Sequence, residues 1–354
     1  MPQKTPAELG FYMPAEWYPH AATWLTWPKD PETWPGRVEQ VEKTYLEIIA
    51  ALAPHETVNL LVDDDTTEQA VRRHCNFPGA ENVRFHQIPT VDSWIRDYGP
   101  NFLLSHDGKA GAFNDWIFNA WGNKYEALKQ DDEIPRLLEP ILKLSRFEPG
   151  IVLEGGSIEV DGNGCVLTTE QCLLNPNRNP QLSRGEIEQC LKDYLGVVKV
   201  LWLGEGIVGD DTDGHIDDIA RFVAPNVIVC AVEDDPQDAN YEILQDNLKR
   251  LKVMTNANDR PFEIVTLPMP GIVGGSSTAT RDLDRLPASY ANFLIANNVV
   301  LLPVFGHPND ARAVETLQRV FRDRRVVPID CEPLVWGMGT IHCLSQQQPA
   351  LIPA

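Results

Sequence analysis

Two kinds of segment alternate along the chain, and this alternation limits the folds that the sequence can adopt. Short β-branched and apolar runs, typical of buried strands, are separated by longer segments with helical periodicity. The clearest strands are predicted at Thr57–Val62, Cys165–Thr169, Val227–Val232 and Val299–Val304. The clearest helices are predicted at Arg37–Ala53, Glu186–Leu195, Ala239–Met254 and Asp310–Phe321. Strands that alternate with helices indicate an α/β fold.

Glycines punctuate this alternation at nearly even distances. For Gly99, Gly155, Gly214, Gly274 and Gly337, the successive intervals are 56, 59, 60 and 63 residues. Self-similarity at a fixed period is a signature of repeated structural modules. Because the chain has 24 glycines, other choices would give other spacings, and the modular interpretation needs independent support.

The charge balance is strongly acidic. The 354 residues include 30 Lys and Arg against 51 Asp and Glu, which gives a formal net charge of −21 at pH 7. Such a chain repels phosphate backbones and anionic lipid headgroups, so we expect neither a nucleic acid nor a membrane as partner. An acidic excess also keeps a protein soluble, so the charge alone does not identify a cationic ligand.

The opening residues and the cysteines indicate the compartment. The opening MPQKTPAELG lacks the apolar core of a signal peptide, and the longest apolar runs are far shorter than a membrane span. Seven cysteines with no CxxC pair indicate neither a disulfide framework nor a zinc knuckle. We therefore expect a cytoplasmic protein with reduced thiols.

One cysteine stands in an unusual setting, the segment GMGTIHCLSQQQ at 337–348. A lone cysteine is commonly a small buried hydrophobic residue, and this interpretation of Cys343 holds unless partners for chemistry exist elsewhere. If the segment is extended, neighbouring side chains point to opposite faces, and His342 faces away from Cys343. A proton-transfer partner for Cys343 then has to come from another part of the chain.

A candidate partner lies in GDDTDGHIDDIARFV, at 209–223, which runs from a polar turn into a strand-like pattern. With a period of two, His215 and Asp217 share one face, and Ala220 and Phe222 share the other. A histidine and a carboxylate on one face can converge on a single ligand. Metal ligation competes with this interpretation, although a single His-x-Asp without a second histidine is a weak metal signal.

A third candidate segment is DSWIRDYGP, at 92–100, which is predicted to end a strand in a Gly-Pro turn. An aromatic face beside a carboxylate can recognise a planar cation, which makes Trp94 and Asp97 candidates. We interpret Arg96 as a structural ion-pair partner of a carboxylate. In the later stretch LEGGSIEVD the glycines allow close backbone approach, and Glu154 fits a structural role as well as a functional one.

Six motifs along the chain resemble, in order, those of the agmatine deiminase family. They are MPAEWYPHAATWLTWP, WIRDYGP, LEGGSIEVDG, DTDGHIDDIARF, LPASYANFLIANNVVLLPVFG and GTIHCLSQQQP. That family belongs to a guanidine-modifying superfamily with peptidylarginine deiminases, arginine deiminases and amidinotransferases. The resemblance covers nearly the whole chain. It implies a five-bladed α/β propeller of ββαβ-like modules, with residues 1–354 forming a single catalytic domain of five pseudo-repeats around a central active site.

The resemblance also implies catalytic roles. Cys343 is similar to the family's nucleophile, His215 to its general acid/base, and Asp97 and Asp217 to the carboxylates that hold the guanidinium. A guanidinium stays protonated near neutral pH, so two carboxylates can hold its N–H groups while the thiolate attacks its carbon. The histidine can protonate the leaving ammonia and then activate water, so no cofactor is expected.

Two further positions match the family's substrate pocket. Trp94 resembles an aromatic wall of the pocket, and Asp211 resembles the acidic residue near the far amine of the substrate. The chain departs from the family at Asn123, Met338 and Thr340, which stand where glycines are common. These departures concern the channel for the substrate tail and leave the reacting groups in place.

The implied substrate is agmatine, a small cationic guanidine. Among the motif residues the only basic ones are Arg96 and Arg221, which we interpret as structural, whereas Asp210, Asp211 and Asp213 crowd the predicted entrance. An acidic entrance would attract the ammonium of agmatine and repel the carboxylate of free arginine.

Other functions stay open at this point. An amidinotransferase uses the same cysteine and histidine but passes the amidino group to an amine instead of water. Arginine and peptidyl-arginine deiminases apply the same chemistry to other tails, and a non-catalytic binding scaffold would keep these residues in its core. The sequence also leaves open whether the chain forms a homo-oligomer.

Overall fold

The computed structural model describes residues 4–274 and 285–352, and the strands in this part of the chain form five separate sheets. The first sheet contains β17 (Ser345–Pro349), β2 (His20–Thr26), β3 (Thr57–Val62) and β4 (Val83–Gln87). The second contains β1 (Phe11–Tyr12), β5 (Asn101–Ser105), β6 (Gly111–Asn114) and β7 (Ser145–Phe147). The third contains β8 (Glu159–Val160), β9 (Cys165–Thr169) and β10 (Lys199–Leu203). The fourth contains β11 (Ala220–Ala224), β12 (Val227–Val232) and β13 (Glu263–Pro268). The fifth contains β14 (Leu294–Ile295), β15 (Val299–Val304) and β16 (Arg325–Asp330).

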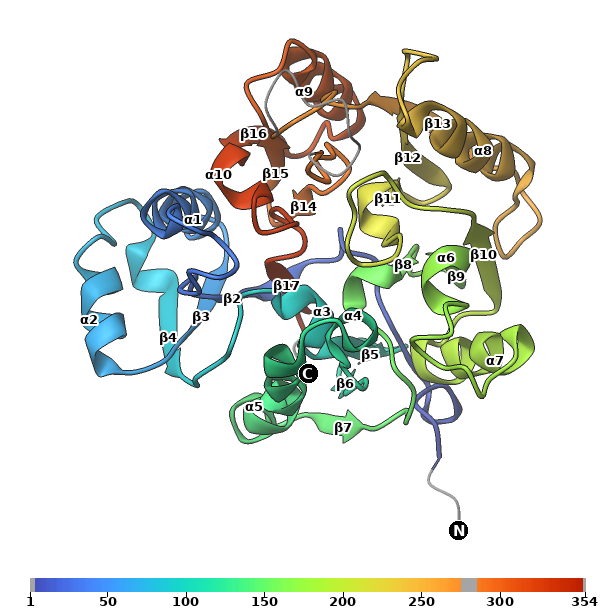
Figure 1. Ribbon diagram of the computed structural model, residues 1–354. Helices are drawn as coiled ribbons and strands as arrows, with labels where there is room; N and C mark the ends of the chain where they lie inside the picture. Colours follow the sequence, from blue (N-terminus) through green and yellow to red (C-terminus); the bar gives the residue numbers. More distant parts are fainter. Residues whose placement is uncertain (1–3, 275–284, 353–354) are drawn as a thin grey trace.

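Each sheet combines an antiparallel strand pair with a parallel neighbour that is reached through a helix. The connecting helices are α1 (Val38–Leu52), α5 (Ile134–Leu142), α7 (Arg184–Leu195), α8 (Asn240–Val253) and α9 (Asn309–Val320). In the third sheet, for example, β8 and β9 are antiparallel, α7 follows, and β10 lies parallel to β9. Parallel neighbours need such a crossover connection. The fold is therefore α/β, as predicted, and Figure 1 shows the five sheets spread around the middle of the molecule.

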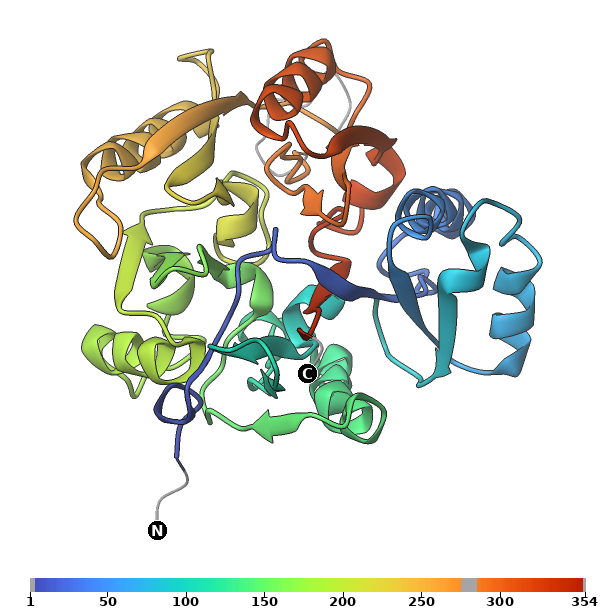
Figure 2. The same ribbon diagram turned by 180° about the vertical axis from the view of Figure 1, so that it is seen from behind.

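The first sheet joins two distant parts of the sequence. Strand β17 pairs antiparallel with β2, so that Ser345 lies opposite Leu25. Strands β3 and β4 extend the sheet in parallel, with α2 (Asp65–Arg72) between them. In Figure 2 the N-terminal segment (blue) crosses the middle of the molecule toward β2, beside β17 (red).

The long elements follow the predicted pattern closely. All four predicted strands are present with the same bounds, as β3, β9, β12 and β15, and the predicted helices are α1, α7, α8 and α9 with ends shifted by one or two residues. Helix α7 begins at a capping box, in which Ser183 and Glu186 satisfy each other's backbone N–H groups. It ends at Gly196, whose φ of 67° is left-handed and suits glycine.

Short helical turns complete the described structure. They are η1 (Ala7–Leu9), η2 (Ala80–Asn82), α3 (Ile95–Tyr98), α4 (Ala120–Asn123), η3 (Glu126–Glu133), η4 (Gly155–Ser157), α6 (Glu170–Leu173), η5 (Ile216–Asp218) and α10 (Glu332–Val335). Buried apolar side chains form three clusters that link neighbouring sheets. Within residues 4–274 and 285–352, none of the helices combines the length and the apolar character that a membrane crossing requires.

Candidate active site

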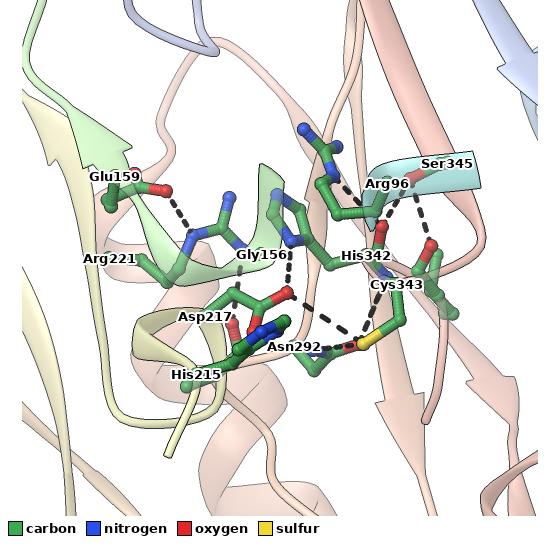
Figure 3. Close-up of polar contacts among 12 residues, drawn as sticks. Arg96, Gly156, Glu159, His215, Asp217, Arg221, Asn292, His342, Cys343 and Ser345 are labelled. Atoms are coloured by element: carbon green, nitrogen blue, oxygen red, sulfur yellow. Dashed lines mark hydrogen bonds and ion pairs between the residues drawn. The ribbon is translucent and has the colours of Figure 1, made fainter. Parts of the chain in front are cut away.

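The candidate site is built from short turns, each of which comes directly before one strand of an antiparallel pair, with one such turn for each sheet. Asp97 lies in α3, before β5, and Gly156 lies in η4, before β8. Asp217 lies in η5, before β11, while Asn292 and Cys343 lie in the turns before β14 and β17. Figure 3 shows side chains from these separate sheets pointing toward one another.

Cys343 is nearly buried, with 8% of its surface exposed, and it lies in a turn, so the alternation of side chains inferred for an extended segment does not apply here. The side-chain amide of Asn292 donates to its Sγ atom at 3.1 Å, and Oδ2 of Asp217 lies 3.8 Å from the sulfur. Burial, together with Asp217 and Asp218, raises the pKa of the Cys343 thiol well above its usual value. The thiol form is therefore favoured before a cation binds.

His215 and Asp217 lie close together, but the strand that was predicted to hold them is a 3-10 turn. His215 precedes η5, and β11 starts only at Ala220. The ring is buried, Nδ1 lies 3.7 Å from Oδ1 of Asp97, and neither ring nitrogen has a hydrogen-bond partner among the described residues. Burial would lower the pKa of His215, but Asp97, Cys172 and Glu154 raise it well above its usual value.

The two predicted carboxylates are both buried, and they differ in their partners. Oδ2 of Asp217 accepts from Nδ1 of His342 at 2.7 Å, whereas Oδ1 has no partner among the described residues. Burial would raise the pKa of Asp217, but His342 and His215 outweigh it and lower that pKa. Burial, opposed by His215 and reinforced by Asp217, raises the pKa of Asp97 to about 6. Two acidic groups with displaced pKa values are typical of a functional site.

Asp97 and Trp94 lie around α3, a helical turn that stands where the sequence predicted the end of a strand. Oδ1 of Asp97 accepts from the backbone N–H of Gly156 at 2.9 Å, and Oδ2 accepts from the indole N–H of Trp121, also at 2.9 Å. Trp94 donates its indole N–H to Asp92 at 3.0 Å. These bonds fix the carboxylate and the aromatic ring relative to the backbone.

Two glycines make the close packing of the site possible. A Cβ atom on Gly156 would lie 2.6 Å from Nδ1 of His215 and 2.8 Å from Oδ1 of Asp97. A Cβ atom on Gly339 would lie 2.6 Å from the Trp94 ring and 3.1 Å from Cβ of Cys343. Any other residue at these positions would displace the side chains of the site.

A cavity of about 720 Å³ opens onto Cys343 and Asp97. Trp94 and Trp121 are among the aromatic residues that line this cavity. Its further lining combines apolar residues such as Leu128 and Met338 with Lys124 and with five acidic side chains, those of Asp30, Glu32, Asp92, Glu126 and Asp211. Aromatic rings and carboxylates together favour a cationic ligand.

The entrance is less acidic than the sequence suggested. Asp211 lines the cavity, but Tyr125 donates to its carboxylate and Nζ of Lys124 lies 3.5 Å away. Asp210 accepts from backbone N–H groups of its own loop, including that of Gly214 at 2.9 Å. Asp213 pairs with Lys124 at 3.0 Å and with Arg178 at 2.5 Å. Three aspartates were predicted to crowd the entrance, and only Asp211 lines the cavity.

The two arginines of the motifs are buried and bind protein groups. Arg221 binds Glu159 at 2.8 Å and Glu16 at 2.5 Å, as expected for a structural ion pair. The predicted carboxylate partner of Arg96 is not among the described contacts. Arg96 instead donates to the side-chain oxygens of Gln346 and Gln347, both at 2.7 Å, and to the backbone oxygen of His342. It therefore anchors the Cys343 turn and β17.

Three residues of the site, Trp121, Lys124 and Asn292, were not singled out from the sequence, whereas the role of Glu154 was left open. Trp121 and Lys124 belong to the WGNK stretch, which the sequence analysis treated only as a departure from the family, and Asn292 belongs to a motif without an assigned role. Glu154 is fully buried; Oε1 accepts from Arg178 at 2.7 Å, and Oε2 has no partner among the described residues. Its place beside His215 supports the functional interpretation.

Two buried groups among the described residues have donors close enough to hold a metal ion. One combines Glu154, Cys172 and His215, and the other combines Glu16, Glu159 and His342. In the second group Arg221 already binds both glutamates. A guanidinium thus occupies the place that a metal cation would need.

A thiol, a histidine and two carboxylates around an aromatic cavity are the groups of a cysteine-dependent enzyme that acts on a planar cation. Residues 12–349 match the family model of the Porphyromonas-type peptidyl-arginine deiminases. Agmatine deiminase of Pseudomonas aeruginosa (strain LESB58) is 39% identical over 367 residues, which cover 99% of this chain and 98% of that protein. Agmatine deiminase of Ectopseudomonas mendocina (strain ymp) is 39% identical over 363 residues, covering 98% and 97%.

A solved structure gives the same result. Agmatine deiminase of Enterococcus faecalis superposes with a TM-score of 0.91 at 37% identity, covering 99% of this chain and 98% of that one. The chain belongs to the Porphyromonas-type peptidyl-arginine deiminase family, and the relatives named here are its agmatine deiminases.

Proposed function

We propose that this protein is an agmatine deiminase, which hydrolyses the guanidinium of agmatine to N-carbamoylputrescine and ammonia. The observation that carries the proposal is the meeting of Cys343, His215, Asp97 and Asp217 from three different turns, beside a cavity that Cys343 and Asp97 line, in a chain related over nearly its full length to agmatine deiminases.

The proposed reaction proceeds in two stages. Asp97 and Asp217 accept N–H groups of the guanidinium, and the Cys343 sulfur forms a bond to its carbon. His215 donates a proton to the departing nitrogen, so that the C–N bond breaks, ammonia leaves and a thiouronium stays on Cys343. Water then attacks the same carbon, gives a proton to His215, and the C–S bond breaks to release the urea product.

The substrate itself favours ionisation of Cys343. Burial and the nearby carboxylates raise the pKa of the thiol in the ligand-free protein. A guanidinium between Asp97 and Asp217 offsets those negative charges and lowers the cost of a thiolate. Cys343 therefore ionises on binding, or a minor thiolate–imidazolium form with His215 is the reactive one.

Asp211 is the proposed partner of the ammonium of agmatine. It lines the cavity and is partly exposed, but it also contacts Lys124. The substrate ammonium then competes with Lys124 for this carboxylate, and free arginine would bring a carboxylate to the same place. Agmatine is for this reason the preferred substrate.

The five sheets are proposed to be the blades of an α/β propeller, and residues 1–354 a single catalytic domain of five pseudo-repeats. The recurrence of an antiparallel pair, a helix and a parallel strand supports this arrangement. So does the place of the site residues, which lie before one strand of the antiparallel pair in different sheets. Each module would contribute one turn to the centre.

The surroundings of the enzyme are proposed from its composition. Seven cysteines without a disulfide are typical of a reducing compartment, which supports a cytoplasmic protein. The net charge of −21 disfavours nucleic acid as a partner. The reaction needs no cofactor, because the proton transfers and the nucleophile come from the chain.

One assay tests the function against its alternatives. Ammonia release is measured with agmatine, arginine and a peptidyl-arginine substrate, without an added amine. We expect release from agmatine, with kcat/KM for arginine lower by at least about a hundredfold. A requirement for an acceptor amine would indicate amidinotransfer, and release from arginine at the same rate would overturn the substrate assignment.

A further inference from the structure

The ring of His342 lies between two buried carboxylates. Nδ1 lies 2.7 Å from Oδ2 of Asp217, and Nε2 lies 2.8 Å from Oε2 of Glu16 (Figure 3 shows the first contact). The ring is 1% exposed. An ionised carboxylate only accepts hydrogen bonds, so this pair of acceptors matches a ring in which both nitrogens donate.

The carboxylate of Glu16 is held in its ionised form by its surroundings. Arg221 binds the same oxygen of Glu16 at 2.5 Å, and the other oxygen accepts from the backbone N–H of Ile295 at 2.6 Å. Burial would raise the pKa of Glu16, but Arg221 and His342 outweigh it and lower that pKa. Glu16 thus provides a fixed negative charge on the side of the ring that faces away from Asp217.

His342 determines which oxygen of Asp217 is free. Oδ2 is engaged by the ring, whereas the fully buried Oδ1 has no partner among the described residues. A buried carboxylate oxygen without a donor is costly, so this oxygen is suited to accept an N–H group from a ligand. The orientation of that oxygen depends on the bond from His342.

The same bond affects the nucleophile. The oxygen that His342 binds is the one that lies 3.8 Å from Sγ of Cys343. The charged groups around the sulfur include Asp217, Asp218 and Asp97, which all disfavour a thiolate, and the cation that faces Asp97 is His215. A positively charged ring on Asp217 would reduce the negative charge that the sulfur meets.

We propose that His342 is a positioning residue for the reaction: as an imidazolium held by Glu16, it orients Asp217 toward the guanidinium and offsets negative charge next to Cys343. The proposal rests on the proposed function and adds to it a residue that touches neither the substrate nor the sulfur.

Two substitutions separate the two bonds of the ring. In His342→Asn the side-chain NH₂ reaches the place of Nδ1 and keeps the bond to Asp217, whereas in His342→Gln it reaches the place of Nε2 and keeps the bond to Glu16. Both variants are neutral. His342→Gln loses the bond to Asp217, and the loss of a hydrogen bond to a charged group lowers a rate constant by about tenfold or more. We therefore expect kcat/KM for agmatine to fall at least about tenfold further in His342→Gln than in His342→Asn.

A second readout does not depend on turnover. Alkylation of Cys343 by iodoacetamide is followed against pH without substrate, with the modified peptide identified by mass spectrometry. Both variants lack the imidazolium, so the apparent pKa of Cys343 should rise and alkylation near pH 8 should slow. His86→Asn is the control, because the ring of His86 contacts Asn59 at 2.9 Å and neither Glu16 nor Asp217, so its loss should leave the alkylation profile unchanged.

The outcomes are distinct. Equal kcat/KM in the two folded His342 variants, or an alkylation profile identical to that of the unmodified protein, would overturn the proposal. If neither variant folds, Glu16→Gln replaces them. This substitution keeps an oxygen that can accept from Nε2 of His342 but removes the negative charge of Glu16. The same rise in the pKa of Cys343 is expected. If the unmodified protein released no ammonia from agmatine, the proposed function would fail, and the alkylation profiles would still decide the role of His342.

Discussion

Replacing Asp97 with asparagine removes the negative charge of the side chain but leaves its shape nearly unchanged. Asp97 accepts the backbone N–H of Gly156 on one oxygen and the indole N–H of Trp121 on the other, both at 2.9 Å. In Asp97→Asn one acceptor oxygen remains, and the NH₂ group must face one of these donors. Because the Gly156 amide is fixed by the backbone, we expect the asparagine oxygen to keep that bond and its NH₂ group to confront Trp121.

The expected loss follows from these contacts. A hydrogen bond to an ionised group contributes about 1.5 to 3 kcal/mol net, and the substitution removes the bond from Trp121 together with the charge that would face the guanidinium. We therefore expect transition-state stabilisation to fall by about 3 kcal/mol or more, which is at least about a hundredfold in kcat/KM.

Steady-state ammonia release from agmatine measures this loss. Asp161→Asn is a suitable control: Asp161 is also buried, and a single oxygen accepts both the Asn163 and the Cys165 backbone N–H groups at 2.8 Å, so an amide oxygen can replace it. The control should retain its activity. A folded Asp97→Asn variant with kcat/KM close to that of the unmodified protein would refute the assigned role of Asp97.

Cys343→Ser should abolish turnover, because an alkoxide is much harder to form than a thiolate. The control variant Cys75→Ala should keep its turnover. Residual ammonia release by Cys343→Ser would exclude Cys343 as the nucleophile. Asp211→Asn should lower kcat/KM for agmatine more than for an alkylguanidine with an uncharged tail, and equal losses for the two substrates would show that Asp211 does not meet the ammonium. The pKa of Asp97 is raised from 3.8 to about 6 in the folded protein, so its contribution to the free energy of unfolding is present below about pH 4 and is lost as the pH rises through about 6. Urea titrations give the free energy of unfolding of the unmodified protein and of Asp97→Asn. The difference between these two values should change by on the order of 3 kcal/mol between pH 4 and pH 7. A difference that does not depend on pH would contradict the raised pKa of Asp97.

The long elements could be predicted because their buried side chains repeat with a clear period. In α1, for example, the buried residues include Val41, Tyr45, Ile48 and Leu52, which lie three or four positions apart. The turns of the site are only three or four residues long, so no period can distinguish them from strand ends. The alternation around His215 suggested a strand, whereas η5 turns the chain tightly before β11 begins.

The contacts within the site depend on which distant turns meet. The candidate residues Cys343, His215 and Asp97 followed from motifs and from the family resemblance, but their distances required the fold. Asn292 and Lys124 carried no local signal, because their roles arise from the bond to Sγ and from the contact with Asp211. Interactions between segments so far apart in sequence cannot be deduced from spacing.

The pairing of β17 with β2 has a consequence for the order of folding. Ser345 and Leu25 are 320 positions apart, and the turn that holds Cys343 leads directly into β17. Hairpins and crossover helices depend on contacts over far shorter separations, and such local contacts form faster than pairings that close a long loop. We therefore expect β17 to join β2 after the local structure of the other sheets has formed, so that the turn with Cys343 is fixed at one end late in folding. A chain arrested before this pairing would have most of its secondary structure and an unactivated thiol outside any pocket.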